Sequence, residues 1–150
     1  MLQIARHTDY AARIVLHLAC LGEGAQASIA EIAEQRMLPA FFVRRLIGKL
    51  VQGGILVTSR GAAGGIRLAR PAAEITLLDL VQVMEGPIAL NHCLDSDHTC
   101  PFATTCPVQS VWTDAARAME SVLAAARFDT LATGTAGHQL AHQQILKPTH

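Results

Sequence analysis

The stretch that decides the fold runs from Ser28 to Arg70 and reads SIAEIAEQRMLPAFFVRRLIGKLVQGGILVTSRGAAGGIRLAR. Ser28 followed by Glu31 has the spacing of a capping box, which predicts a short helix ending near Arg36. After a turn, Pro39 suits the first position of a second helix. The apolar side chains of this second helix recur at helical spacing and are Phe42, Val43, Leu46, Ile47 and Leu50. Two helices separated by a tight turn predict a helix-turn-helix.

A hairpin is expected directly after this helix pair. Residues 55–59 and 66–69 have the composition of strands, and residues 60–65 form a glycine-rich connection between them. A two-stranded hairpin in this position is the wing of a winged helix-turn-helix.

The charges of this stretch point to DNA. The formal net charge of the chain is zero, yet residues 36–70 hold seven of its twelve Lys and Arg residues and none of its twelve acidic ones. One basic face on an otherwise acidic molecule is typical of a protein that binds double-stranded DNA. Arginine pairs with guanine in the major groove, lysine neutralises phosphate, and a hairpin tip reaches the minor groove. The expected DNA-binding residues are Ser28, Phe41, Arg44, Arg45, Lys49, Arg60, Gly64 and Gly65.

Three further helices are expected outside this stretch. Residues 8–21 show helical spacing with Thr8 as a possible N-cap, and residues 76–84 form another short helix. A longer apolar stripe follows near the end of the chain and consists of Val111, Trp112, Ala115, Ala116, Met119, Val122, Leu123 and Ala126. This stripe is longer than one small domain needs, so we expect it to pair two chains.

The chain accordingly divides into four parts. Residues 1–90 are expected to form the winged helix-turn-helix DNA-binding domain, and residues 91–107 a loop rich in cysteine. Residues 108–135 are the expected dimerisation helix, and residues 136–150 a flexible tail. The expected fold class is mainly α with a small β wing, a winged helix-turn-helix extended by a long dimerisation helix.

Compartment and enzyme class follow from what the sequence lacks. The first ten residues contain no apolar segment typical of an export signal or a membrane anchor, so we expect a cytoplasmic protein with no membrane partner. No nucleophile with its base and no phosphate-binding loop is recognisable, which argues against an enzyme. In a reducing compartment, cysteines are expected as metal ligands, redox thiols or core residues. Cys20 lies in the apolar stripe of the first helix and is expected in the core.

The other three cysteines form a ligand pattern. Cys93, Cys100 and Cys106 are spaced Cys-x6-Cys-x5-Cys, and proline follows the last two. Proline keeps the chain out of a helix, which helps thiolates to converge on one centre. This favours an iron-sulfur cluster. Zinc is the main alternative, although the paired Cys-x2-4-Cys knuckles of structural zinc sites are missing. Reactive thiols without a metal are the third possibility.

Four features together resemble a known family. They are Thr8-Asp9-Tyr10, the wing Arg60-Gly61-x-x-Gly64-Gly65-x-x-Leu68, the segment Pro71-x-x-x-Ile75, and the three-cysteine loop. Over about residues 1–130, the chain resembles the Rrf2 superfamily of bacterial regulators, which includes IscR-, NsrR- and RirA-like members. The resemblance implies that Cys93, Cys100 and Cys106 bind an iron-sulfur cluster, either 2Fe-2S or 4Fe-4S, and that the long helix forms a homodimer.

The resemblance leaves the fourth ligand of the cluster open. IscR-like members have a histidine three residues after the last cysteine, where this chain has Gln109. In NsrR-like members the ligand is an aspartate of the partner chain, and Asp9 matches that motif. The alternative for Asp9 is an ordinary acid in the first turn of a helix. His92 and His98 lie in the loop and are further candidates.

The expected function is a repressor that binds an imperfect palindromic operator. It would release the operator when nitric oxide, oxidants or iron shortage damages the cluster, with nitric oxide as the leading signal because of Asp9. Regulation of iron-sulfur assembly genes and a metal-free thiol-based repressor are the alternatives. An electron-transfer protein is less favoured, since it needs no basic wing. Arg44 replaces an acidic residue of the IscR pattern, so the operator sequence should differ from the IscR one.

Overall fold

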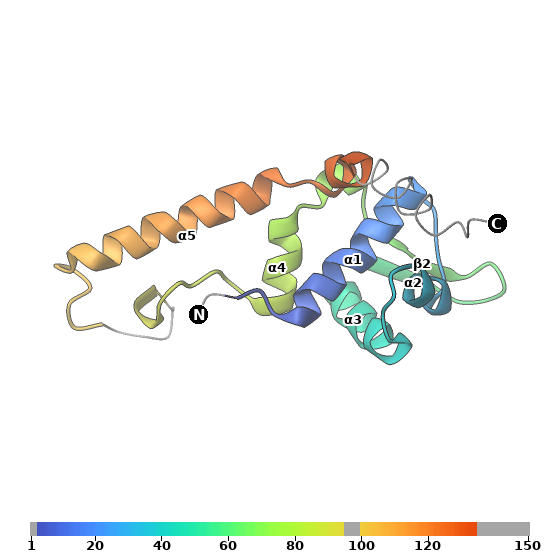
Figure 1. Ribbon diagram of the computed structural model, residues 1–150, viewed down its shortest axis with the longest axis horizontal. Coiled ribbons are helices and arrows are strands. Elements are labelled where there is room, and N and C mark those ends of the chain that lie inside the picture. Colours follow the sequence, from blue (N-terminus) through green and yellow to red (C-terminus); the bar gives the residue numbers. More distant parts are fainter. Residues whose placement is uncertain (1–2, 95–99, 135–150) are drawn as a thin grey trace, which may run out of the picture.

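The computed structural model describes residues 3–94 and 100–134 (Figure 1). A compact head made of the first four α-helices and a two-stranded sheet carries one long helix that extends away from it. The expected flexible tail over 136–150 lies outside the described residues. The mainly helical fold with a small β wing confirms the predicted fold class.

The core of the head lies between four helices. They are α1 (Arg6–Leu21), α2 (Ile29–Gln35), α3 (Ala40–Gln52) and α4 (Leu77–Glu85). Each contributes an apolar face to one cluster, whose fully buried members include Ile14, Leu18, Ile32, Leu50 and Leu80. Burying such side chains stabilises the fold by about 1.5–3 kcal/mol each. The helix-turn-helix is therefore held at a fixed angle against α1 and α4.

The turn between α2 and α3 is tight. Met37 adopts a positive φ of 51°, and the amide of Leu38 donates to the carbonyl of Ala33 at 2.9 Å. Leu38 itself is buried beneath the turn. Pro39, predicted as the first helical residue, is instead the N-cap of α3, so the helix starts one residue later, at Ala40. These features confirm the predicted helix-turn-helix.

The first helix begins earlier than predicted. α1 starts at Arg6 with Ala5 as its N-cap, and Ala5 makes no side-chain cap. Thr8, the expected N-cap, is 2% exposed and lies inside the helix. Its hydroxyl donates to Oε1 of Glu85 at 2.6 Å. The expectation for Thr8 is wrong because its oxygen has a partner at the end of α4 rather than in its own helix.

The wing is an antiparallel hairpin. It consists of β1 (Leu56–Ser59) and β2 (Gly65–Leu68), with Leu56 opposite Leu68 and Ser59 opposite Gly65. Ala27, just before α2, adds an isolated antiparallel bridge to Ile66. The hairpin agrees with the predicted one to within a residue at each strand end, and the bridge ties its second strand to the helix-turn-helix.

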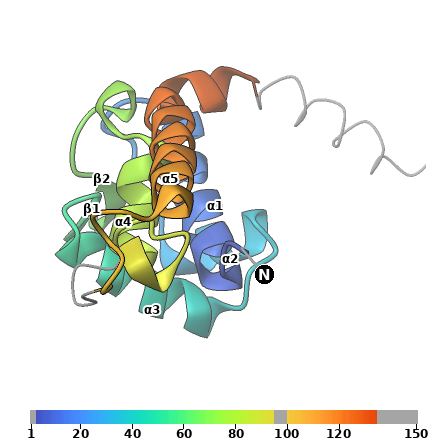
Figure 2. The same ribbon diagram turned by 90° about the vertical axis from the view of Figure 1, so that its left-hand side faces the viewer.

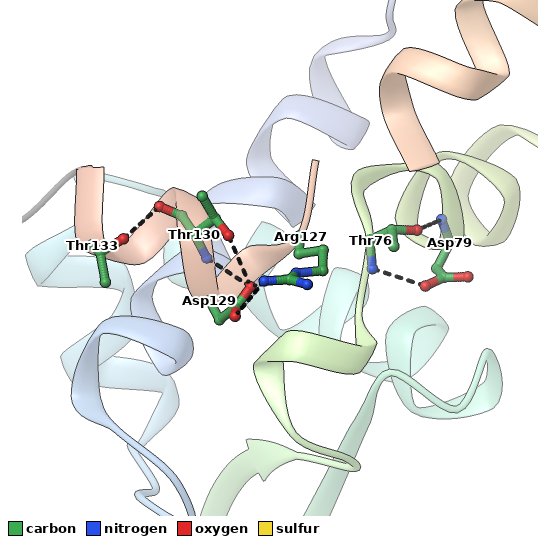
Figure 3. Close-up of polar contacts among 6 residues, drawn as sticks. All are labelled: Thr76, Asp79, Arg127, Asp129, Thr130 and Thr133. Atoms are coloured by element: carbon green, nitrogen blue, oxygen red, sulfur yellow. Dashed lines mark hydrogen bonds and ion pairs between the residues drawn. The ribbon is translucent and has the colours of Figure 1, made fainter. Parts of the chain in front are cut away.

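A capping box starts α4. The amide of Asp79 donates to the Thr76 hydroxyl at 3.1 Å, and the Thr76 amide donates back to the Asp79 carboxylate at 2.8 Å (Figure 3). A short 3-10 turn (η1, Ala72–Glu74) precedes it, and Gly86 ends the helix. The predicted helix over 76–84 is thus present with a shift of one residue.

The long helix is α5 (Pro107–Ala125). It is reached through a second 3-10 turn, η2 (His92–Leu94), and its start points away from the head (Figures 1 and 2). No helix in residues 3–94 and 100–134 is long and apolar enough to cross a membrane.

The helix ends ten residues before the predicted limit of 135. Beyond Ala125 the chain pairs with the segment before α4: the Leu77 amide donates to Ala126 at 2.8 Å, and the Phe128 amide to Ile75 at 3.0 Å. Phe128 is 1% exposed in the core, and helical backbone resumes over residues 128–134. One continuous helix would break these bonds and carry Phe128 away from the core.

Candidate DNA-binding surface and cysteine loop

Helix α3 presents one apolar and one basic face. Val43, Leu46, Ile47 and Leu50 are buried, as predicted, whereas Phe42, also predicted for the buried face, is only partly buried. The opposite face exposes the predicted DNA-binding residues Phe41, Arg44, Arg45 and Lys49, together with Ala40 and Gly48. Phe41 is 70% exposed, and its ring centroid lies 4.4 Å from that of Phe42. In a helix-turn-helix this helix enters the major groove.

Several basic residues of the stretch have partners inside the protein. Nζ of Lys49 donates to the carbonyl of Met84 at 2.7 Å, Nε of Arg36 to Nδ1 of His17 at 3.3 Å, and Arg70 pairs with Asp79 at 3.3 Å. A second group is exposed and, within residues 3–94 and 100–134, has no ion pair or side-chain hydrogen bond: Arg44, Arg45, Arg60 and Arg67. Of this group, Arg44, Arg45 and Arg60 are predicted DNA-binding residues, and their charges remain available to phosphates and bases.

The Arg36 contact has an electrostatic consequence. His17 is almost fully buried in α1, and this burial, together with the Arg36 charge, lowers the pKa of its imidazole. Glu31 acts in the opposite direction with a smaller effect. Among the described residues, Nε2 of His17 and Nη2 of Arg36 have no hydrogen-bond partner. The neutral imidazole of His17 therefore accepts the hydrogen bond from Arg36 that joins α1 to the end of α2.

Ser28 lies at the start of the helix-turn-helix. It is the N-cap of α2, and its side-chain oxygen accepts from the amide of Glu31 at 3.1 Å. Ser28 is exposed, so a hydroxyl proton is still available to a phosphate. Its assignment as a DNA contact stays a prediction, with a capping role now visible beside it.

The wing tip is shaped by glycine and braced by glutamine. A Cβ on Gly64 would overlap the backbone of Ser59, Arg60 and Gly61, so the turn closes only with glycine there. Nε2 of Gln26 donates to the carbonyl of Ala63 at 2.6 Å from outside the hairpin. The turn leaves Arg60 exposed at the tip.

Sequence reasoning missed the contribution of residues 26 and 27 to the wing. The segment before Ser28 has no alternation of apolar and polar residues, because only one residue of it pairs with the wing strand. A lone bridge and a side-chain brace have no sequence signal of their own.

The three loop cysteines lie around the start of α5. Cys93 belongs to η2, Cys106 is the N-cap of α5, and all three, including Cys100, are free thiols of intermediate exposure. Nε2 of Gln109 donates to the carbonyl of Cys93 at 3.2 Å, which fastens η2 to the first turns of α5. The residue that departs from the IscR-like pattern thus has a structural role in the loop.

The other candidate ligands are spread out. Asp9 is 52% exposed on α1 and pairs with Arg13 at 2.8 Å. His92 is exposed in η2, and His98 lies outside the described residues. Within the described ranges, no group of three or more His, Cys, Asp or Glu side chains is close enough to hold a metal ion. The donor chemistry fits an iron-sulfur cluster, since three free thiols flank one loop, and binding would require the sulfurs to move together.

One face of α5 is apolar and uncovered in the single chain. Val111 is 61% and Val122 is 70% exposed, and Val108 and Trp112 are exposed as well. Figure 1 shows the first half of the helix extending beyond α1 and α4. Apolar side chains along such a helix favour association with another surface.

Comparison with known proteins identifies the family. Residues 4–134 match the model of Rrf2, described as an iron-dependent transcriptional regulator. The chain is 33% identical over 131 residues to Protein aau3 of Rhizobium meliloti, covering 87% of this chain and 84% of the relative. It is 31% identical over 123 residues to the HTH-type transcriptional regulator NsrR of Oceanobacillus iheyensis, covering 81% and 84%.

Solved structures agree. The structure of CymR, the global cysteine regulator of B. subtilis, is similar with a TM-score of 0.74 and 27% identity over 90% of this chain and 99% of that one. IscR of T. potens gives a TM-score of 0.67 and 26% identity, covering 89% and 88%. The chain therefore belongs to the Rrf2 family, and it is a DNA-binding transcriptional regulator rather than an enzyme.

Proposed function

We propose that this chain is a homodimeric repressor whose affinity for an imperfect palindromic operator depends on an iron-sulfur cluster held by Cys93, Cys100 and Cys106. One observation carries the proposal. The helix that Cys106 caps at its start is hydrogen-bonded to the DNA-binding head just beyond its end. The cysteine loop and the head are thus joined by a single rigid element.

The chemistry of the loop suits a sensor. When bound, the cluster would supply iron that reacts with nitric oxide or oxidants, or that is lost when iron is scarce. Three thiolates of this chain would hold it, and Asp9 of the other protomer is the proposed fourth ligand. Asp9 is available for this because its surface pair with Arg13 is worth only about 0–1 kcal/mol. The Asp9 motif keeps nitric oxide as the leading signal.

Helix α5 would transmit the state of the loop to the head. At 1.5 Å per residue it is roughly 28 Å long. At its start, Gln109 holds the Cys93 carbonyl; just beyond its end, Ala126 and Phe128 bond the segment before α4. A change in the conformation of the loop would therefore tilt α5 and displace the attached head. In a dimer, this alters the spacing of the two recognition helices on the operator.

The exposed face of α5 would form the dimer. Pairing it with a second copy buries Val108, Val111, Trp112 and Val122, which lie exposed in the single chain. Two heads related by the dimer axis match the two halves of a palindrome. In each head, α3 would enter the major groove and Arg60 of the wing the minor groove.

A metal-free thiol-based repressor is the second candidate. It is favoured by the absence of a three-donor group among the described side chains. The similarity to a structure described as a global cysteine regulator supports it as well. In this case, oxidation of the loop thiols, rather than a change in a cluster, would control the affinity for the operator.

Anaerobic purification separates the two candidates. We expect a coloured protein with iron and acid-labile sulfide, whose operator affinity falls when nitric oxide is added. Cys106→Ala should lose colour, whereas Cys20→Ala should keep it, because Cys20 lies in α1 outside the loop. A colourless, iron-free dimer that binds the operator as tightly as the reconstituted protein would disprove the cluster proposal.

The fourth ligand has its own test. Asp9→Ala should change the visible spectrum and accelerate cluster loss. Asp114→Ala is the matched control, because Asp114 is another exposed aspartate in a surface pair, with Arg117 at 3.7 Å. Identical spectra for wild type and Asp9→Ala would remove Asp9 from the ligand set.

A further inference from the structure

A cavity of about 660 Å³ lies where three segments of the head meet. They are the end of α1 with its following turn, the stretch from β2 to η1, and the helical residues after α5. Small side chains leave the space open: Ala19, Ala69, Ala72 and Ala132 line it. Its volume is in the range of sites that bind small molecules, about 300–1,000 Å³.

The acidic and basic groups that line the cavity are not equally available. Asp129 accepts from Nε of Arg127 at 3.1 Å and from the amide of Thr130 at 2.7 Å, so its charge is already balanced (Figure 3). Arg70 shares its charge with Asp79. Arg67 also lines the cavity and has no ion pair within the described parts of the chain. The available cation is thus Arg67.

We propose that this cavity binds a small molecule with one carboxylate and a short apolar body. The carboxylate would pair with Arg67, whose guanidinium offers a fork of donors suited to it. The apolar body would lie against the alanines and Leu68. Glu23, in the turn after α1, is the uncommitted acid of the lining and would repel the carboxylate from that side.

The position of the cavity gives the ligand a regulatory effect. Arg67 is in β2 of the wing, opposite Val57, whereas Ala132 lies in the segment anchored at the end of α5. The Cys20 thiol lies 3.9 Å from the carbonyl of Ala132, so α1 contacts that segment at the same place. A ligand held between these walls would fix the wing relative to α5. This regulatory part rests on the proposed function, while binding itself does not.

Thermal unfolding of the full-length protein tests binding without DNA or cluster. The carboxylates used are hexanoate and benzoate, and the neutral controls are hexanamide and benzamide. The carboxylates should raise Tm in a concentration-dependent way and the amides should not. Arg67→Gln should weaken carboxylate binding about tenfold, the usual size of a lost charged hydrogen bond. Arg60→Gln removes the same charge from the wing tip, outside the cavity lining, and should bind as wild type.

Two further variants sharpen the test. Glu23→Gln should tighten carboxylate binding, and Ala73→Phe should abolish it by filling the cavity at an exposed position. The proposal is overturned if neither carboxylate raises Tm more than its amide, or if Arg67→Gln responds like wild type. Carboxylate binding that leaves operator affinity unchanged would overturn the regulatory part alone.

Discussion

The hydroxyl of Thr8 and the carboxylate of Glu85, seventy-seven positions apart, form a hydrogen bond of 2.6 Å that joins the first turn of α1 to the last residue of α4. The amide of Ala5 donates to the same oxygen at 3.0 Å. Glu85 is followed by Gly86-Pro87, where the chain leaves the head for the cysteine loop. The Glu85 carboxylate therefore fixes the first turn of α1, which carries Asp9, next to the point where the chain enters the cysteine loop.

Thr8→Val keeps the shape of the buried side chain and removes this donor. We expect the free energy of unfolding to fall by about 1–3 kcal/mol, because the carboxylate loses a charged hydrogen bond. Urea unfolding measures this change in the free energy of unfolding. Thr58→Val, an exposed position in β1, is the control and should change stability by less than about 0.5 kcal/mol. Equal effects of the two substitutions would mean that the Thr8–Glu85 bond contributes nothing.

Gly64→Ala should impair DNA binding with little effect on the core. The added Cβ meets the backbone of the wing turn, so the tip must open and Arg60 moves with it. Losing the Arg60 contact should cost about 1–3 kcal/mol of operator affinity, measured by gel shift on an operator obtained by binding selection. Ala62→Ser, in the same exposed turn, should bind normally. Unaltered affinity of Gly64→Ala would exclude the wing tip from the interface.

Arg44 and Lys49 should differ in their importance for DNA. Arg44 is exposed and uncommitted among the described residues, so Arg44→Gln should weaken operator binding by about 1–3 kcal/mol. Lys49 is held by the Met84 carbonyl, so Lys49→Met should mainly lower stability, by about 1 kcal/mol. Operator titrations at several salt concentrations measure the affinities of both variants, and urea unfolding measures their stabilities. If Lys49→Met loses as much affinity as Arg44→Gln, the lysine leaves Met84 in the complex.

The parts of the fold that sequence predicts are those with local causes. Helical spacing defines α3, and the glycine-rich run between two strands defines the wing. The misplaced N-cap has a distant cause, because the partner of Thr8 is Glu85. The end of α5 also depends on distant residues: an alanine-rich run contains no local stop, and the bonds of Ala126 and Phe128 to the segment before α4 end the helix.

The candidate site likewise has features that the sequence predicts and features that depend on distant contacts. Charge distribution is a property of composition, so the basic surface is visible in the sequence. Which cations are free is decided by contacts across the fold, as Lys49 with Met84 and Arg36 with His17 show. The role of Gln109 in holding the Cys93 carbonyl is likewise invisible in the spacing of the cysteines.

The buried contact of His17 with Arg36 predicts a pH dependence of stability. Burial first, and the Arg36 charge second, lower the pKa of His17 from its ordinary value of 6.5. Below that value the unfolded chain takes up a proton that the folded protein resists. The free energy of unfolding should therefore fall as the pH drops from 6.5 to the lower folded pKa, and this loss should be absent above 6.5.

Urea unfolding between about pH 7.5 and about pH 5.5 measures this loss. His17→Gln retains an oxygen that can accept from Arg36 and should flatten the profile relative to wild type. His7→Gln, at an exposed position of the same helix, should keep the wild-type slope. Because Arg36 is the C-cap of α2, protonation of His17 in the folded protein places two cations between α1 and the helix-turn-helix. Operator affinity should therefore fall as the pH drops through the lowered folded pKa of His17, in wild type and His7→Gln but not in His17→Gln. Superimposable profiles for wild type and His17→Gln would show that the imidazole is not the titrating group.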